Sequence, residues 1–351
     1  MPDQSIESLY PFVKDFPKGA NLAEQAWKQG KQLLGTPLPF LGGAMTWVSD
    51  PALVSAIGQA GGFGVLASGA MPPNILSQTI TETQKARVPF GVNLIVMHPQ
   101  LDQMAETCID QNVSHVVLAG GLPPKNVLQA LKDAEIKVLT FAPTAALARR
   151  FAAGGIDGLI IEGNEAGGHI GPVSTSVLAQ EILPLNLPIP VFVAGGIGTG
   201  QMIASYTQMG AAGCQMGTIF VCAEESCAHP KFKQAFIRAA ARDATVSVQL
   251  DPGFPVIPVR GLKNKATQDF MQAQKDTIQQ VQNGSLSKAD GQLQIEHFWA
   301  GALRRAVQDG DIETGSLMAG QSVGLVKQTE PCKTIMARLL KETLAALEKS
   351  A

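Results

Sequence analysis

Short, continuous runs of apolar residues recur between residues 39 and 216, and segments with helical periodicity separate them. A run such as Val116-Val117-Leu118 does not alternate with polar residues, which is typical of parallel strands covered on both faces. Helices are predicted at 51–60, 126–134, 145–153 and 200–209. The apolar runs predict eight strands, at 39–42, 63–67, 90–96, 115–118, 137–141, 158–161, 191–194 and 213–216.

This alternation of strands and helices indicates β-α-β units with right-handed crossovers. Eight such units within about 180 residues favour a closed (β/α)8 barrel, the TIM barrel, and an open doubly wound sheet is the alternative. The first helix carries clear end signals, because Ser49-Asp50 offers a cap, Pro51 suits the first turn, and Gly61-Gly62 stops it.

The two ends of the chain and its C-terminal third differ from the repeated units. Residues 1–37 are expected to form an N-terminal extension with one amphipathic helix at 21–34. The barrel would comprise 38–228 and 301–351, with closing helices at 299–307 and 333–347. Residues 229–300, with helices at 231–241 and 267–282, predict a mostly helical subdomain for substrate or subunit contact.

Composition narrows the classes of partner. The 351 residues are 45% hydrophobic and 16% charged, with a formal charge of −2 and no basic run, so no nucleic-acid or anionic-lipid surface is predicted. No stretch reaches the ~18 apolar residues of a membrane span, and the first residues do not resemble a secretory signal. The five Cys contain no C-x-x-C pair, so we expect no disulfide framework or zinc site and a cytoplasmic protein.

In such a barrel, the chemistry lies in the loops that follow the strands. Gly43, Ala44 and Met45 follow the first strand, and residues this small would let a flat ring lie against the backbone. Asn93 lies inside an apolar strand, where a carboxamide is costly unless it finds partners. It either ties two strands together or contacts a cofactor at the barrel mouth.

The sixth strand runs into Glu162 and then Gly167-Gly168-His169. The glycines permit a ligand to approach the main chain closely, and a histidine there can act as an acid, a base or a hydrogen-bond donor near neutral pH. The alternatives are a histidine bonded to a carbonyl, or a metal ligand together with Glu162 or Glu165. No second histidine is nearby, so no metal is predicted.

Glycine-rich turns follow the last two strands. Ala194-Gly195-Gly196 ends the seventh, and Gln215-Met216-Gly217-Thr218 ends the eighth at a predicted helix start. Exposed N–H groups at these two turns form the usual phosphate site of this barrel. The glycines at 196, 198 and 200 lack the spacing and the chain position of a dinucleotide fingerprint, which excludes a Rossmann domain.

Other polar residues carry weaker signals. Arg260 and Lys263 would meet a phosphate or a charged carrier, or belong to a solvated face. The histidines at 115, 229 and 297 and the cysteines at 214 and 222 are interpreted as structural residues.

Taken together, residues 39–326 resemble the family of nitronate monooxygenases (2-nitropropane dioxygenases) and flavin-dependent type II enoyl-ACP reductases. The most specific part is Glu-x-x-Glu-Ala-Gly-Gly-His-x-Gly at 162–171. The resemblance implies FMN, with its phosphate at the turns after strands seven and eight and its ring facing His169. We therefore predict His169 as the catalytic residue. The predicted cofactor contacts are Gly43, Ala44, Met45, Asn93, Glu162, Gly167, Gly168, Ala194, Gly195, Gly196, Gln215, Gly217 and Thr218.

Segments at 47–50, 225–230, 259–264 and 315–321 look more like the enoyl-reductase branch, although Gly42 stands where the family usually has Gln. The resemblance thus implies reduction of a small or acyl-carrier-bound enoyl thioester, with NADH or NADPH as co-substrate. Oxidation of alkyl nitronates by O2 and reduction of quinones are the alternatives. A homodimer is a further possibility.

Overall fold

The computed structural model describes residues 5–350, apart from the side chain of Glu296. Eight parallel strands close into a barrel in the order β1-β2-β3-β4-β5-β6-β8-β9, so the predicted barrel is confirmed and the open sheet is excluded. Each predicted strand is present with its ends shifted by no more than one residue. The strands are β1 (Phe40–Gly42), β2 (Phe63–Ala67), β3 (Phe90–Ile95), β4 (His115–Ala119), β5 (Lys137–Phe141), β6 (Gly158–Glu162), β8 (Val191–Ala194) and β9 (Gly213–Met216).

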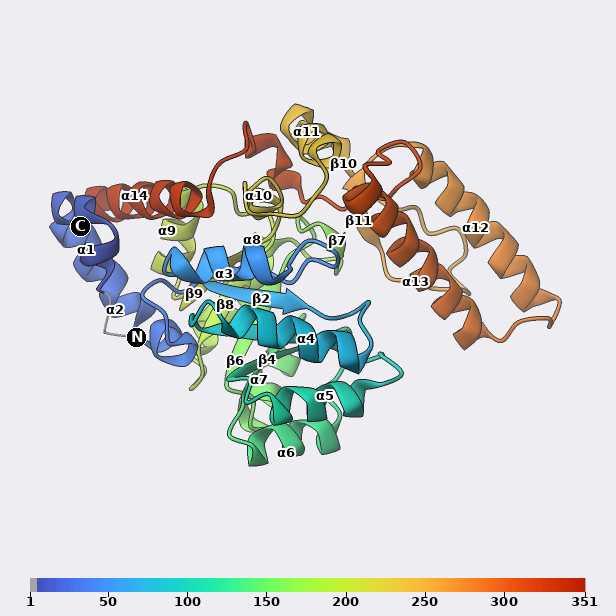
Figure 1. Cartoon of the computed structure of the whole chain (residues 1–351), viewed down its shortest axis with the longest axis horizontal. Coiled ribbons are helices and arrows are strands. Elements are labelled where there is room, and N and C mark those ends of the chain that lie inside the picture. Colours follow the sequence, from blue (N-terminus) through green and yellow to red (C-terminus); the bar gives the residue numbers. More distant parts are fainter. Residues whose placement is uncertain (1–4, 351) are drawn as a thin grey trace.

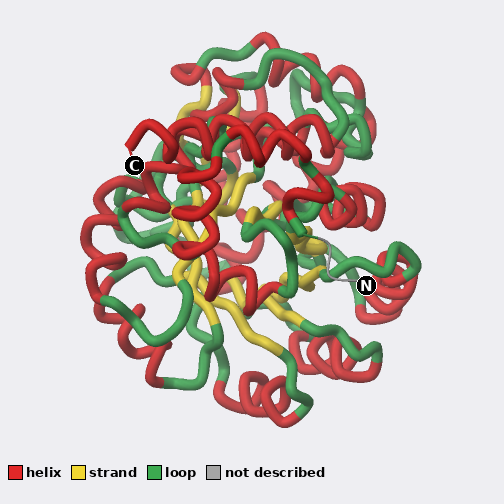
Figure 2. The backbone as a smooth tube through the Cα atoms, turned by 90° about the vertical axis from the view of Figure 1, so that its left-hand side faces the viewer, coloured by secondary structure: helices red, strands yellow, loops and turns green. Residues whose placement is uncertain are grey.

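Helices surround this barrel, as the end-on view of the yellow strands shows (Figure 2). The first begins as predicted, because the Asp50 side chain accepts a hydrogen bond from the N–H of Leu53 at 3.0 Å and Pro51 takes the first helical position. The helices that follow the strands are α3 (Pro51–Gln59), α4 (Pro73–Gln84), α5 (Leu101–Asp110), α6 (Lys125–Asp133), α7 (Ala145–Ala153), α8 (Thr175–Ile182), α9 (Gly200–Gln208) and α10 (Thr218–Val221).

The N-terminal segment closes the bottom of the barrel. After α1 (Ile6–Leu9), α2 (Pro17–Leu34) begins four residues before the predicted helix and packs against α14 (Cys332–Ser350) and α9. Leu34 at its end is fully buried in the cluster that fills the barrel interior. The helix α1 and the C-terminal end of α14 lie at the same end of the molecule (Figure 1).

The subdomain stands at the opposite end, beyond the mouth toward which the arrow of β2 points (Figure 1). It contains α12 (Lys265–Gln282) and α13 (Lys288–Arg304), and α13 runs across residue 300, where we expected a boundary. The helix α11 (Pro230–Arg238), which we also expected in the subdomain, instead buries Phe232 and Phe236 in the main core around the barrel. The subdomain also contains two strands that were not predicted, β10 (Ala244–Val246) and β11 (Val259–Leu262). These form a three-stranded sheet with β7 (Gly168–His169) from the loop after β6.

The subdomain has its own small core, built from Phe254, Val256, Phe270, Ile295 and Trp299. Phe270 and Trp299 stack with ring centroids 4.3 Å apart, which joins α12 to α13. No helix within residues 5–350 has the length and apolar character to cross a membrane.

Candidate functional site

The top layer of the barrel interior is polar. Ile160 and Phe192 belong to the interior core, and side chains two residues apart on a strand share a face. Glu162 and Ala194, two residues further on, therefore face the interior at the mouth. The strand register places Glu162 beside Ala194 and Ala194 beside Gln215. Three of the predicted cofactor contacts thus form one row across β6, β8 and β9.

Asn93 lies in β3 at the same end of the barrel and is 7% exposed. Its Nδ2 donates to the carbonyl of Val117 in β4 at 3.0 Å. The amide therefore ties two strands together, which is the structural role that we weighed for it. Among the described residues no donor bonds its Oδ1, so that atom can accept a hydrogen bond from a ligand.

Glu162 is partly accessible and lies among uncharged neighbours. Within residues 5–350 its carboxyl group forms no ion pair and accepts no hydrogen bond. Loss of water around it raises the pKa of the Glu162 carboxyl to about 7. The charge of this group is therefore sensitive to pH near neutrality.

The loop after β1 is fixed against the mouth by a serine that we did not predict as a site residue. The Ser49 hydroxyl donates to the carbonyl of Gly43 at 3.0 Å and accepts from the N–H of Met45 at 2.9 Å. A Cβ on Gly43 would lie 3.1 Å from the Gln215 side chain, so a larger residue there would force that side chain to shift. The wall formed by residues 43–45 is thus tied to Ser49 and has small residues at Gly43 and Ala44, which leaves space for a planar ligand. Ala44 contributes to the interior cluster.

The turns after β8 and β9 provide unused N–H groups. Gly195 and Gly196 have φ of +95° and +72°, which favours glycine, and a Cβ on Gly195 would lie 2.9 Å from Thr175 Oγ1. The N–H groups of Gly195, Gly196, Gly217 and Thr218 donate to no acceptor in the described part of the chain. Because β8 and β9 are neighbours, these free donors lie on adjacent turns, and such groups bind anions, so the residues present fit the phosphate of a nucleotide cofactor.

His169 is exposed and sits on a backbone that is held on both sides. It pairs with Val259 across the β7–β11 ladder, and Gly168 pairs with Arg260. A Cβ on Gly167 would lie 2.5 Å from the N atom of Gly320, so the 319–320 segment packs directly on this loop. The backbone of His169 is therefore fixed in a short strand, while its side chain is exposed.

Two charged side chains, Glu165 and Arg260, hold the segment that leads to His169. Glu165 Oε2 accepts from the N–H and the hydroxyl of Thr175, both at 2.8 Å, at the start of α8. Its carboxylate therefore stabilises a helix N-terminus.

No group of three or more His, Cys, Asp or Glu side chains in residues 5–350 is arranged to hold a metal.

Arg260 differs from our expectation of a phosphate or carrier contact. It is 7% exposed, and its Nε and Nη1 donate to the carbonyls of Asn164 and Ala244 at 2.8 and 2.6 Å. It links the His169 loop to the subdomain sheet, and desolvation lowers its pKa. Lys263, in contrast, is exposed.

Most of the other histidines and cysteines that the sequence analysis considered have structural surroundings. His115 Nε2 lies 2.7 Å from the carbonyl of Leu33 at the end of α2, and His229 Nδ1 accepts from the N–H of Lys231 at the start of α11. His297 is exposed. Cys214 and Cys222 are buried, and desolvation raises the pKa of both thiols.

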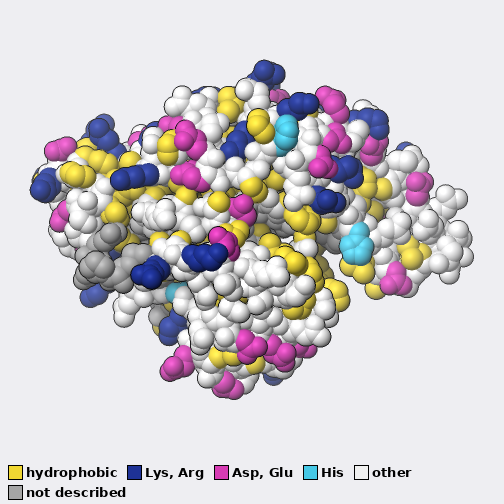
Figure 3. All heavy atoms as spheres, viewed as in Figure 1, with side chains coloured by type: hydrophobic (Ala, Val, Ile, Leu, Met, Phe, Trp, Pro, Cys, Tyr) yellow, Lys and Arg dark blue, Asp and Glu magenta, His cyan; other side chains and the backbone are white. Residues whose placement is uncertain are grey.

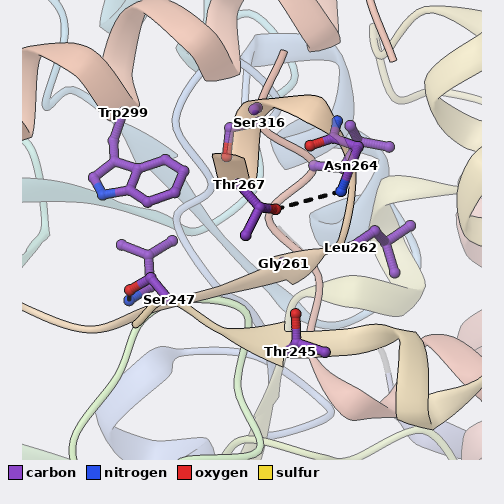
Figure 4. Close-up of a pocket in the computed structure, with 11 residues that line it drawn as sticks. Thr245, Ser247, Gly261, Leu262, Asn264, Thr267, Trp299 and Ser316 are labelled. Carbon is purple, nitrogen blue, oxygen red and sulfur yellow. Dashed lines mark hydrogen bonds between the residues drawn. The ribbon is translucent and has the colours of Figure 1, made fainter. Parts of the chain in front are cut away.

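A small cavity lies inside the subdomain, between β11 and the helices α12 and α13. Thr245, Thr267, Ser316 and Trp299 line it, and the N–H of Asn264 donates to Thr267 Oγ1 (Figure 4). Its volume of about 20 Å³ is enough for about one water molecule. This cavity is therefore too small for a substrate.

The fold is a (β/α)8 barrel whose mouth carries unbonded N–H groups at the turns after β8 and β9. The family model for nitronate monooxygenase matches residues 29–113 and 102–342. An octahydro-indene carboxyl-CoA dehydrogenase from Rhodococcus jostii is 30% identical over 343 residues, which cover 90% of this chain and 96% of that protein.

Two solved structures are similar as well. FabK from Thermotoga maritima is 36% identical with a TM-score of 0.80, covering 91% of this chain and 97% of that one. A nitroalkane oxidase from Streptomyces ansochromogenes is 25% identical with a TM-score of 0.74, covering 92% and 99%. The chain belongs to the nitronate monooxygenase family and is an oxidoreductase, and membership of this family implies a flavin.

Proposed function

We propose that this oxidoreductase uses FMN to reduce an enoyl thioester with NADH or NADPH. In the overall reaction the β-carbon would gain a hydride and the α-carbon a proton, so the C=C bond would be reduced while NAD(P)H is oxidised to NAD(P)+. The observation that carries this choice is the 36% identity, over nine-tenths of the chain, to FabK, an enoyl-ACP reductase II. The dehydrogenase relative named above also acts on a thioester.

The mouth supports FMN as the cofactor. Four N–H donors at Gly195, Gly196, Gly217 and Thr218 would hold its phosphate, and the wall at 43–45 would hold its ring. When bound, the flavin supplies the hydride-transfer chemistry that no side chain can provide.

An apolar rim supports an acyl substrate. Met97 and Leu122, in the loops after β3 and β4, are 58% and 53% exposed, and Ile75 at the start of α4 is 40% exposed. Apolar side chains gather on the edge of the barrel that faces the subdomain (Figure 3). Covering such side chains with an acyl chain is favourable by about 25 cal/mol per Å² of apolar surface.

His169 would act on the thioester end of the substrate. From the β7–β11 ladder at the mouth, its ring would donate a hydrogen bond to the thioester carbonyl oxygen, where negative charge develops as hydride arrives. A histidine can also supply the proton for the α-carbon at neutral pH.

Oxidation of nitronates is the second candidate, favoured by the family model and by the nitroalkane oxidase structure. In that reaction His169 would hold the nitronate anion instead of a thioester oxygen.

Anaerobic stopped-flow absorbance separates the two functions. The purified protein is mixed in parallel with NADH, NADPH and propyl-3-nitronate. We expect the flavin to bleach with one of the nucleotides and to reoxidise on addition of crotonyl-CoA. Bleaching by the nitronate alone would overturn the reductase in favour of the second candidate. A colourless protein that binds no FMN would contradict both.

A further inference from the structure

Residues 317–321, which we call the strap, contact three parts of the mouth but take no part in the proposed reaction. On one side the strap meets the subdomain sheet, where the N–H of Leu262 in β11 donates to the carbonyl of Leu317 at 2.8 Å. On another side it meets the loop after β6, where the N–H of Gln321 donates to the carbonyl of Glu165 at 2.9 Å. The strap is therefore tied both to the strand that pairs with β7 and to the loop that precedes β7.

The strap and the loop after β6 touch backbone to backbone. A Cβ on Gly167 would lie 2.5 Å from the N atom of Gly320, so neither segment has room for a side chain between them. Ala319, in the middle of the strap, is fully buried. Close-packed segments without flexible side chains at the contact transmit a displacement from one to the other. A shift of the strap would therefore move Gly168 and His169, which follow directly in the chain.

The third contact of the strap is with the turn after β9. The N–H of Gly320 donates to the hydroxyl oxygen of Thr218 at 3.0 Å. Thr218 is partly exposed, and in residues 5–350 its hydroxyl donates its own hydrogen to no acceptor. A hydroxyl group can accept and donate at the same time, so this one can bind the strap and an anion together.

We propose that Thr218 is a positioning residue for His169. Its hydroxyl donates to the phosphate of the cofactor while it accepts from Gly320, so an occupied phosphate site holds the strap, and with it the loop of His169, in place. This inference rests on the FMN in the proposed function. It gives the phosphate end of the cofactor a role in placing the histidine, in addition to its role in affinity.

The coupling follows from the chain of hydrogen bonds. A hydroxyl that donates to an anion is polarised, and this strengthens the hydrogen bond that the same oxygen accepts from Gly320. Without an anion, the hydroxyl hydrogen of Thr218 can turn only towards water. Such a coupling is reciprocal, because a change that loosens the strap must weaken phosphate binding by the same factor by which phosphate tightens the strap.

Hydrogen–deuterium exchange of the apoprotein tests the coupling, with saturating inorganic phosphate compared with chloride at equal ionic strength. We expect phosphate to slow exchange in 163–170 and in the strap by about fivefold, the effect of one hydrogen bond of ordinary strength. Thr218→Val, which keeps the shape but lacks the hydroxyl, should abolish this protection, and Thr218→Ser should retain it. Thr81→Val, which removes the hydroxyl of an exposed residue on α4, should follow the wild type.

A substitution on the far side of the strap tests the reverse direction. A Cβ on Gly261 in β11 would lie 2.7 Å from the carbonyl oxygen of Leu317, so Gly261→Ala must displace the strap although it lies on neither cofactor turn. In calorimetric titrations we expect it to weaken phosphate binding by the factor that it removes from the protection of 163–170. Gly301→Ala in α13 is the matched control, because a Cβ there meets no atom within 4 Å, and it should change neither quantity.

FMN and riboflavin, which lacks the phosphate, separate this inference from the proposed function. In the wild type FMN should protect 163–170 more than riboflavin does, and Thr218→Val should remove the difference. If FMN binds but phosphate slows exchange no more than chloride, or protects Thr218→Val as well as the wild type, the coupling is wrong while the cofactor stands. If the protein binds neither FMN nor phosphate, the cofactor fails and the coupling fails with it. Thermal unfolding confirms that each variant is folded.

Discussion

The floor and the mouth of the barrel are built from the same strands, yet their side chains have opposite character. The floor is filled by Leu34, Leu41, Phe63 and Phe192, all fully buried. Two residues further along the strands the interior positions are Glu162, Ala194 and Gln215, which are small or polar.

The difference shows how one strand can serve stability and chemistry at once. A period of two residues places successive interior side chains in layers, so the lower layer can be chosen for packing and the upper layer for binding. α2 reinforces the floor from outside the repeated units, and β7–β11 reinforces the mouth. Substitutions in the two layers should therefore affect different quantities.

The largest effect is expected at the mouth, for His169→Ala. If the imidazole stabilises charge and donates a proton, turnover of the enoyl thioester should fall by about 10²–10⁴-fold. The flavin content, measured by the ratio of visible to ultraviolet absorbance, should stay near that of the wild type. Equal losses of flavin and turnover would show that the histidine supports the site structurally.

Phe192→Ala tests the floor. The ring is fully buried in the interior cluster, so its removal should lower the free energy of unfolding by about 3–5 kcal/mol. Flavin affinity of the fraction that remains folded should change little. Urea unfolding and FMN titration on the same sample measure the two quantities, and a large loss of affinity with unchanged stability would contradict the division into layers.

The sequence predicted the barrel well, because each buried strand is a continuous apolar run between turn residues. It did not predict β7, β10 or β11. Gly168–His169 is too short for any periodicity, and β11 contains Arg260 and Gly261, which are not typical of a strand. These strands exist because residues 168–169 and 259–262, far apart in the chain, meet at the mouth.

The sequence predicted the site residues at strand ends, but it missed contacts that depend on residues far apart in the chain. Strand order and the two-residue period bring Glu162, Ala194 and Gln215 together as expected from their positions at strand ends. Local sequence gave no sign that the Ser49 hydroxyl bonds Gly43 and Met45, because the same residue also fits the helix-start pattern. Arg260 looked like a ligand contact because burial cannot be read from its neighbours along the chain.

A smaller effect is expected at Glu162. Unlike the apolar residues of the floor, this residue should make the free energy of unfolding depend on pH. In the unfolded chain this carboxyl ionises near its ordinary pKa, whereas in the folded apoprotein its pKa is raised to about 7. Stability is therefore lost as the pH rises between these values and stays low above them. Glu162→Gln should leave stability unchanged near pH 4.5 and raise it by at most about 3 kcal/mol near pH 8, at roughly 1.4 kcal/mol per tenfold change.

Urea unfolding of the flavin-free protein at both pH values tests this prediction. Glu106→Gln, on the exposed face of α5, should shift stability by less than about 0.5 kcal/mol at either pH. A Glu162→Gln effect that is the same at both pH values would mean that the side chain contributes by packing and not by ionisation.

The smallest effect should come from Arg260→Lys. This substitution tests whether the contact between the loop at the mouth and the subdomain sheet holds His169 in position. Lysine keeps the charge but cannot donate to the carbonyls of Asn164 and Ala244 with one planar group. Losing one hydrogen bond from a charged donor should cost about 2 kcal/mol of stability. Because the loop that carries His169 loosens, kcat should fall several-fold with little change in KM. Lys263→Ala, which removes an exposed cation just beyond the end of β11, should leave both constants unchanged. If both variants instead raise KM together, the two cations contact the substrate and the mouth extends onto the subdomain sheet.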